Sequence, residues 1–228
     1  MADAAPAGGY PPAESFVTPS RARLAAAVRR LVDAVLTAEV DREHLDAAAD
    51  ATEAAIAALG GNDGTGPAVP HRGRAERRHE DYLPRSPLVG ALHPAAAPFA
   101  WDFRGDRFVA HGVLGAAFEG PPGYVHGGWV ALMFDEALGM ANVAGGNPGM
   151  TARLTVRYRR PTPLRTPVRI EAWTQAREGR RITTVGTLHA GDILCAEAEG
   201  LFVQIGAERA LEYFGERSAS PDPVDPLP

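Results

Sequence analysis

Residues 125–144 read VHGGWVALMFDEALGMANVA, and this stretch decides the fold of the 228-residue chain. Its only clearly polar side chains are His126, Asp135, Glu136 and Asn142, and a Gly-Gly-Asn-Pro sequence follows it. A helix that is apolar on nearly all sides is buried on most of them. The stretch therefore predicts one long central helix over residues 126–144, wrapped by the rest of its domain.

Segments with strand character lie on both sides of this helix. Residues 99–103 and 107–119 flank an Arg-Gly-Asp turn, and four more candidates follow the helix at 150–160, 168–178, 181–190 and 193–205. The first of these four alternates in the manner of a strand, with apolar residues at every second position from Ala152 to Tyr158. Glycine turns separate the last three, as in hairpins. The pattern predicts an α+β fold, in which an antiparallel sheet meanders around a single helix.

Composition divides the rest of the chain. Residues 1–19 are rich in Ala, Pro and Gly, and we expect them to be disordered. Residues 20–59 predict an N-terminal helical hairpin with Ser20 as its first N-cap, and residues 60–97 form a Pro/Gly/Arg-rich linker. The main domain covers residues 98–206. A short helix and a disordered tail are expected over residues 207–228.

Charge and composition exclude several classes of function. The net charge of −5 disfavours nucleic-acid binding, and all 23 basic residues are arginine, which removes lysine chemistry. Cys195 is the single cysteine, so neither an intramolecular disulfide nor a CxxC metal site is possible. GxSxG and HExxH motifs are absent. No apolar run approaches the ~20 residues of a membrane span, and the N-terminus has no signal-peptide pattern. We expect a cytoplasmic protein without a metal.

Two features of the predicted helix point to chemistry. Burying Asp135 in an apolar helix costs several kcal/mol unless the carboxylate has a partner. The alternative, for Asp135 and for Glu136, is that the helix emerges there at an edge or a subunit interface. Gly127 and Gly128 lie in the first turn, where free N–H groups can polarise a carbonyl and stabilise an oxyanion. Simple steric relief would explain the two glycines equally well.

The spacing of these features places them in different subunits. His126 and Asp135 are nine residues apart, which corresponds to about 13.5 Å of helical rise. One chain therefore cannot bring its helix N-terminus and its own Asp135 to one small substrate. Two antiparallel copies of the helix across a two-fold axis can. We expect a site that is shared between subunits.

The sequence resembles the hotdog-fold acyl-CoA thioesterases, in particular their PaaI-like and THEM4-like branch. FEGPPGYVHGG at 118–128, Asp135, and TARLTVRYRRPTPL at 151–164 carry the resemblance, which covers about residues 98–205. It implies a hotdog fold, that is, a curved antiparallel sheet around a long helix. It also implies a homodimer or a homotetramer.

The resemblance further implies roles for individual residues. Asp135 matches a general base or nucleophile, Gly127 matches the N–H donor to the thioester carbonyl, and His126 matches a residue that helps to position this carbonyl. Thr151 lies where relatives carry a Thr or Ser that helps to orient the attacking water. Some PaaI-like relatives have an Asn where this chain has Gly120, which leaves carbonyl orientation more dependent on His126.

Substrate-binding residues are expected next to the helix start and on the sheet. Gly128 allows close approach of a ligand, and Trp129 either shapes an acyl tunnel or packs in the core. Arg180 and Arg181 match a basic pair near the coenzyme A nucleotide, with Arg157, Arg159 and Arg160 as second candidates, because guanidinium groups suit phosphates.

The prediction is an acyl-CoA thioester hydrolase with no cofactor beyond the coenzyme A of its substrate. Two alternatives stay open: a biosynthetic hotdog enzyme acting on carrier-protein thioesters, and a non-catalytic acyl-CoA-binding module.

Overall fold

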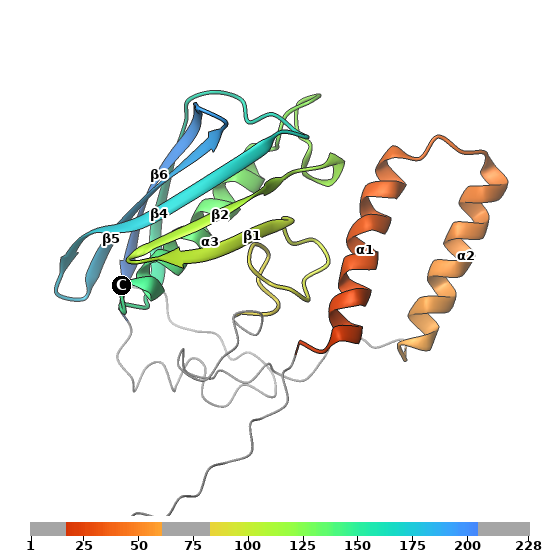
Figure 1. Cartoon of the computed structure of the whole chain (residues 1–228), viewed down its shortest axis with the longest axis horizontal. Helices are drawn as coiled ribbons and strands as arrows, with labels where there is room; N and C mark the ends of the chain where they lie inside the picture. The colour runs from red at the N-terminus through yellow and green to blue at the C-terminus, as the bar shows by residue number, and fades with distance from the viewer. Residues whose placement is uncertain (1–16, 61–82, 205–228) are drawn as a thin grey trace, which may run out of the picture.

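The computed structural model describes residues 17–60 and 83–204 of the chain. A six-stranded antiparallel sheet and one long helix form its main body, and a pair of helices stands beside it (Figure 1). The strands are β1 (Phe99–Arg104), β2 (Arg107–Val113), β3 (Met150–Tyr158), β4 (Pro167–Glu178), β5 (Arg181–Ala190) and β6 (Ile193–Val203), in the spatial order β1-β2-β4-β5-β6-β3. The helices are α1 (Pro19–Thr37), α2 (Arg42–Ala58) and α3 (Gly127–Ala144), and a short 3-10 helix, η3 (Ala116–Phe118), precedes α3. The predicted fold class is confirmed.

Several boundaries differ from those expected. Ser20 does not cap α1: Thr18 does, with its Oγ1 accepting from the Arg21 N–H at 3.3 Å, and Pro19 takes the first helical position that suits proline. The strand expected over 107–119 ends at Val113, because the chain turns into η3. The short helix and tail expected over 207–228, like residues 1–16, lie outside the described residues.

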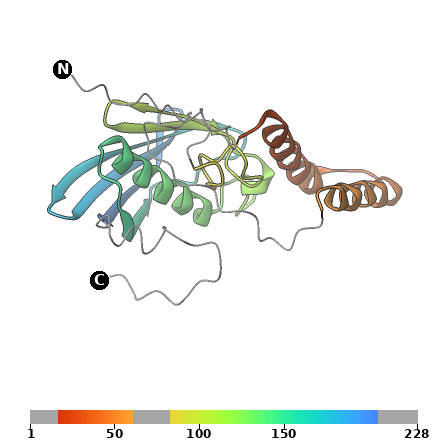
Figure 2. The same cartoon turned by 90° about the horizontal axis from the view of Figure 1, so that it is seen from below.

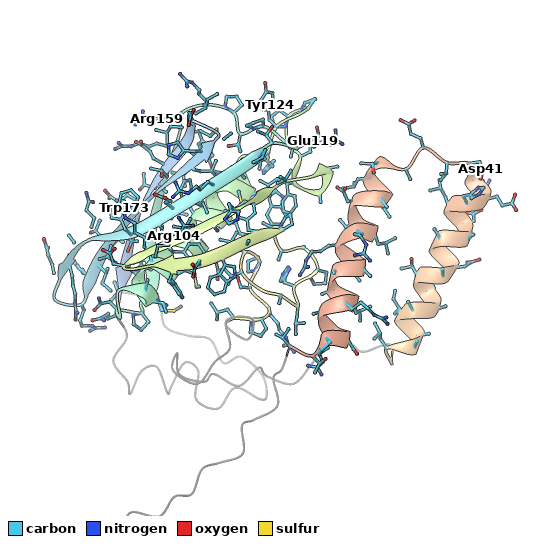
Figure 3. All side chains as sticks on the ribbon, in the orientation of Figure 1. Asp41, Arg104, Glu119, Tyr124, Arg159 and Trp173 are labelled. Carbon is cyan, nitrogen blue, oxygen red and sulfur yellow. The ribbon has the colours of Figure 1, made fainter. Side chains whose placement is uncertain are left out.

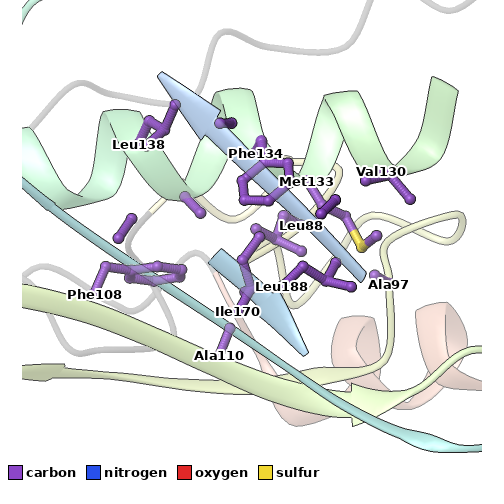
Figure 4. Packing of buried hydrophobic residues seen from close by; sticks show 14 of the residues in the cluster. Leu88, Ala97, Phe108, Ala110, Val130, Met133, Phe134, Leu138, Ile170 and Leu188 are labelled. Carbon is purple, nitrogen blue, oxygen red and sulfur yellow. The ribbon is translucent and has the colours of Figure 1, made fainter. Parts of the chain in front are cut away.

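Helix α3 lies against one face of the sheet (Figure 2). Its sheet-facing side carries Met133, Phe134 and Leu138, which are fully buried against Phe108 and Ile170 of the sheet (Figure 4). Near its C-terminal end Asn142 is also buried, and its Oδ1 accepts a hydrogen bond from the Thr184 hydroxyl. The other side of α3 is open in this chain, with Gly128 and Asp135 exposed. The expectation that α3 is wrapped on most sides therefore fails at the side that carries Gly128 and Asp135.

The segment over residues 83–97 belongs to the packed body. Leu88 is only 2% exposed and lies in the same core as α3, and the Trp101 Nε1–H donates to the Val89 carbonyl at 3.3 Å. The Ser86 hydroxyl accepts hydrogen bonds from the Leu88 and Val89 N–H groups. This segment forms part of the surface against which helix α1 rests.

Polar side chains of helix α1 bond to backbone groups of the body. Arg29 donates from Nη2 to the Ala91 carbonyl at 2.8 Å and from Nε to the His93 carbonyl at 3.2 Å. Asp33 accepts at Oδ1 from the Ala116 N–H at 3.0 Å. A Cβ on Gly115 would lie 2.7 Å from that oxygen, so a glycine is needed there for the approach of Asp33. Helix α2 buries none of its residues. Among the described helices, none combines the length and the apolar character required to cross a membrane.

Candidate active site

His126 caps the N-terminus of α3. Its Nδ1 accepts the Gly128 N–H at 3.0 Å, and its carbonyl accepts the N–H groups of Trp129 at 3.0 Å and Val130 at 3.3 Å. A neutral imidazole that accepts at Nδ1 carries its proton on Nε2. The cap therefore leaves His126, which is exposed, with an N–H donor for a ligand.

The first N–H of the helix is the one left without an acceptor among the described residues. The N–H groups of Gly128, Trp129 and Val130 are bonded to His126, whereas that of Gly127 is not bonded within this part of the chain. A helix N-terminus favours negative charge, because its unpaired N–H groups and its dipole point outward. Gly127 therefore offers a fixed donor to a carbonyl oxygen that gains negative charge.

Tyr158 holds the Gly127 peptide in place. Its hydroxyl, at the end of β3, donates to the Gly127 carbonyl at 2.8 Å. Tyr158 had no predicted role in the site, because 31 residues separate it from Gly127 along the chain. The sequence feature that could have pointed to Tyr158 was its position as the last residue of an alternating strand, directly before the Arg-Arg-Pro sequence.

The loop before α3 is packed tightly against His126. The His126 N–H donates to the Phe118 carbonyl at 2.9 Å, and a Cβ on Gly120 would lie 2.7 Å from the His126 Cα. A larger residue at position 120 would therefore displace the cap. An asparagine has no room at this position, so the orientation of a carbonyl at the helix start depends on other polar groups such as His126 and the Gly127 N–H.

The burial of the neighbouring carboxylates Asp135 and Glu136 differs from what the sequence predicted. Asp135 is exposed on the open side of α3, so the premise that it is buried is wrong for a single chain: the sheet covers the opposite side of the helix. Glu136 is the half-buried carboxylate. Burial raises the pKa of Glu136, a hydrogen bond with Ser86 opposes this rise, and the nearby charge of Asp135 adds to it. Glu136 thus connects α3 to the 83–97 segment.

Thr151, Arg180 and Arg181 lie away from the helix start, whereas Arg157 and Arg159 are the chain neighbours of Tyr158. Thr151 is near the opposite end of β3 from Tyr158, about 23 Å along the strand. Arg180 and Arg181 lie at the turn between β4 and β5, where the Arg180 Nε donates to the Gln204 carbonyl at 3.0 Å.

Arg157 and Arg159 both face Glu197, at 3.7 and 2.5 Å. The Arg159 hydrogen bond lowers the pKa of Glu197, so this carboxylate competes with any phosphate for both guanidinium groups. Figure 3 labels Arg159 at the same end of the sheet as Tyr124.

The structure therefore separates the predicted site into two groups. His126, Gly127, Gly128 and Trp129 lie together at the start of α3. Asp135 is eight residues further along the helix, about 12 Å of rise, and Thr151, Arg180 and Arg181 lie toward the far end. Within residues 17–60 and 83–204, no three His, Cys, Asp or Glu side chains gather as metal ligands would. The arrangement places an unpaired N–H donor at one end of the helix and an exposed carboxylate in its middle.

Three comparisons agree on one kind of protein. The model of the thioesterase superfamily matches residues 122–197. Acyl-coenzyme A thioesterase THEM4 of Xenopus laevis is 39% identical over 93 residues, which is 40% of this chain and 42% of that protein. The mouse (Mus musculus) protein of the same name is 34% identical over 99 residues, 42% of this chain and 43% of that one. The chain thus spans about two fifths of the length of these curated relatives.

A solved structure matches over a much larger share of the chain. It is the crystal structure of a thioesterase superfamily protein, 35% identical, with a TM-score of 0.69. The match covers 81% of this chain and 90% of that one. It extends well beyond the segment matched by the superfamily model, and therefore includes most of the described residues.

Proposed function

Since the chain belongs to the thioesterase superfamily, we propose that it hydrolyses acyl-coenzyme A thioesters. The observation that carries the proposal is the unpaired Gly127 N–H at the start of α3, next to the Nε2–H of His126. Both relatives above bear the name of acyl-coenzyme A thioesterases. Thioester hydrolysis requires an oxyanion donor, a base and a bound water; these residue types can supply the donor and the base and can hold the water by hydrogen bonds.

The substrate carbonyl binds at the start of α3. Its oxygen accepts the Gly127 N–H and is oriented by His126, while the Tyr158 hydroxyl holds the Gly127 carbonyl. Negative charge develops on this oxygen when water attacks, and a fixed donor at a helix N-terminus stabilises it without reorganisation. The carbonyl carbon thereby becomes more electrophilic, and the tetrahedral intermediate forms at this carbon.

The base comes from a second copy of the chain. Asp135 lies on the open side of α3, and β3 is an edge strand of the described sheet, so two chains can associate through these surfaces about a two-fold axis. Antiparallel α3 helices then place Asp135 of one copy beside Gly127 of the other. Thr151 helps to orient the water, and Arg180 and Arg181 bind the phosphates of coenzyme A.

The chemical steps balance with these groups alone. Asp135 takes a proton from water as the water oxygen bonds to the carbonyl carbon. The tetrahedral intermediate then expels the coenzyme A sulfur as the carbon–sulfur bond breaks, and the thiolate takes the proton back from Asp135. The products are a carboxylic acid and free coenzyme A.

Replacing Asp135 by Asn tests the base. Loss of a general base costs about 10²- to 10⁴-fold in kcat, so D135N should be almost inactive on a panel of acyl-CoA substrates followed with a thiol-detecting reagent. Size-exclusion chromatography should show an unchanged oligomer.

Retained activity in D135N would overturn the assignment of the base. Thiol release from carrier-protein thioesters alone, or binding of acyl-CoA without release, would instead contradict acyl-CoA hydrolysis by the wild-type chain.

A further inference from the structure

A cavity of about 800 Å³ lies between α1 and the main body. This volume is within the range of about 300–1,000 Å³ typical of small-molecule sites. Most of its wall is apolar, contributed by Val32 and Ala34 of α1, the Pro94–Ala96 turn, Val113, Ala117, Phe118 and Trp129. Such a wall suits a hydrocarbon group rather than a polar one.

The cavity is held open by the contacts that attach α1. Arg29 and Asp33 both border it, and their side chains are already bonded to backbone groups of the 83–97 segment and of η3. These bonds fix the distance between α1 and the body. The space between the two is therefore a defined part of the fold.

One residue of the first turn of α3 borders the same cavity. Trp129, two residues after Gly127, lines it and packs edge-on against Phe118, with ring centroids 5.0 Å apart. The Phe118 carbonyl in turn accepts the His126 N–H. A group bound against Trp129 and Phe118 thus rests on the segment that positions the oxyanion donor.

Positive charge borders the apolar wall. The exposed guanidinium groups of Arg30 and Arg165 lie at the cavity, and Arg165 has the left-handed backbone conformation, with φ of +54°. An apolar chain attached to an anionic carrier matches this combination, because the chain fills the interior while the carrier remains near the arginines.

We propose that this cavity binds the apolar acyl chain of the thioester substrate, so that α1 forms part of the substrate site and sets the preferred chain length. The inference rests on the proposed function, to which it adds the class of acyl group. Acyl chains long enough to reach the α1 wall should be favoured over acetyl and propionyl groups. Each methylene buried contributes about fourfold in affinity.

Filling the cavity from either wall tests the inference. Ala34→Trp on α1 and Ala95→Phe on the facing turn both place bulk in the cavity. Val35→Trp is the matched control, because Val35 is 70% exposed and does not border the cavity. Titration calorimetry with S-decyl-coenzyme A and S-ethyl-coenzyme A, thioethers that cannot be hydrolysed, measures binding independently of turnover.

The wild-type chain should bind S-decyl-coenzyme A at least about 100-fold more tightly than the S-ethyl compound, which corresponds to burial of about three to four of the additional methylenes. A34W and A95F should each lose about tenfold or more of S-decyl affinity and keep S-ethyl affinity, whereas V35W should change neither. The matching loss should appear in kcat/KM for decanoyl-CoA, with propionyl-CoA turnover unchanged.

Equal affinity of the wild-type chain for the two thioethers would overturn the inference. Unchanged S-decyl affinity in A34W and A95F, or the same loss in V35W, would also overturn it. Absence of hydrolysis at every chain length would refute the proposed function instead, and the thioether titrations would still decide whether the cavity binds an alkyl chain.

Discussion

At the scale of single residues, the Gly127 N–H can be removed without changing the helix. Proline lacks an N–H but is well accepted at the first helical position, and His126 already has the extended backbone that precedes proline (φ −61°, ψ 134°). The Tyr158 ring lies 3.5 Å from where a Cβ would be, which is ordinary contact. Gly127→Pro should therefore lower kcat about 10²- to 10³-fold and leave the thermal midpoint nearly unchanged.

Gly127→Ala is the control for this change, because it adds a Cβ and keeps the N–H. Steady-state kinetics and thermal unfolding of both variants separate loss of the donor from loss of space. Equal activity of G127P and G127A would show that this N–H does not contribute to the reaction.

Sequence reasoning succeeded where a local pattern determines local geometry, and failed where a distant contact does. The His-Gly-Gly sequence predicted a helix start with free N–H groups, and His126 and Gly127 lie there. Tyr158 was missed because its bond to Gly127 depends on the packing of β3 against the helix start. Asp135 was expected to be buried because the helix is apolar overall, and composition does not reveal which side the sheet covers.

At the scale of elements, Glu136 links α3 to the 83–97 segment. Its pKa is raised mainly by burial, so the folded chain binds the proton more tightly than the unfolded chain does. Its contribution to stability is therefore fully present below the unfolded pKa of about 4.3 and is lost as the pH rises through the raised folded value.

Glu136→Gln should consequently be more stable than the wild-type chain at neutral pH, since Gln retains a partner for Ser86 without a buried charge. The difference in thermal midpoint should shrink as the pH falls toward 4. Glu178→Gln, at the exposed end of β4, serves as the control. A difference in thermal midpoint that stays constant with pH would contradict the role of burial in raising the pKa of Glu136.

The elements themselves were largely predictable, and their docking was not. Hydrophobic periodicity and glycine turns located three helices and six strands. The α1 N-cap moved from Ser20 to Thr18 because Pro19 fits the first helical turn. The attachment of α1 through Arg29 and Asp33 depends on backbone groups far along the chain, and a sequence pattern contains no sign of it.

At the scale of the whole molecule, the resemblance to the thioesterase superfamily is confirmed, and the shared site remains a prediction. Mixing two inactive variants tests it. A hybrid of Gly127→Pro and Asp135→Asn subunits has one site that keeps both wild-type groups, if each site takes one group from each copy.

Unfolding and refolding the two variants together should therefore restore activity to about a quarter of the wild-type level, since about half of the pairs are hybrids with one intact site each. Each variant refolded alone is the control. If the mixture stays as inactive as its components, Gly127 and Asp135 act within one chain or do not act together.

The open edge of β3 has a consequence for the solubility of a separated subunit. A strand at the margin of a sheet presents unpaired peptide groups that template the addition of other extended chains, and aggregation follows. Met150 and Tyr158, at its two ends, are apolar or aromatic and exposed. Association of two copies would shield this margin, so variants that weaken pairing should precipitate at concentrations where the paired protein stays dispersed.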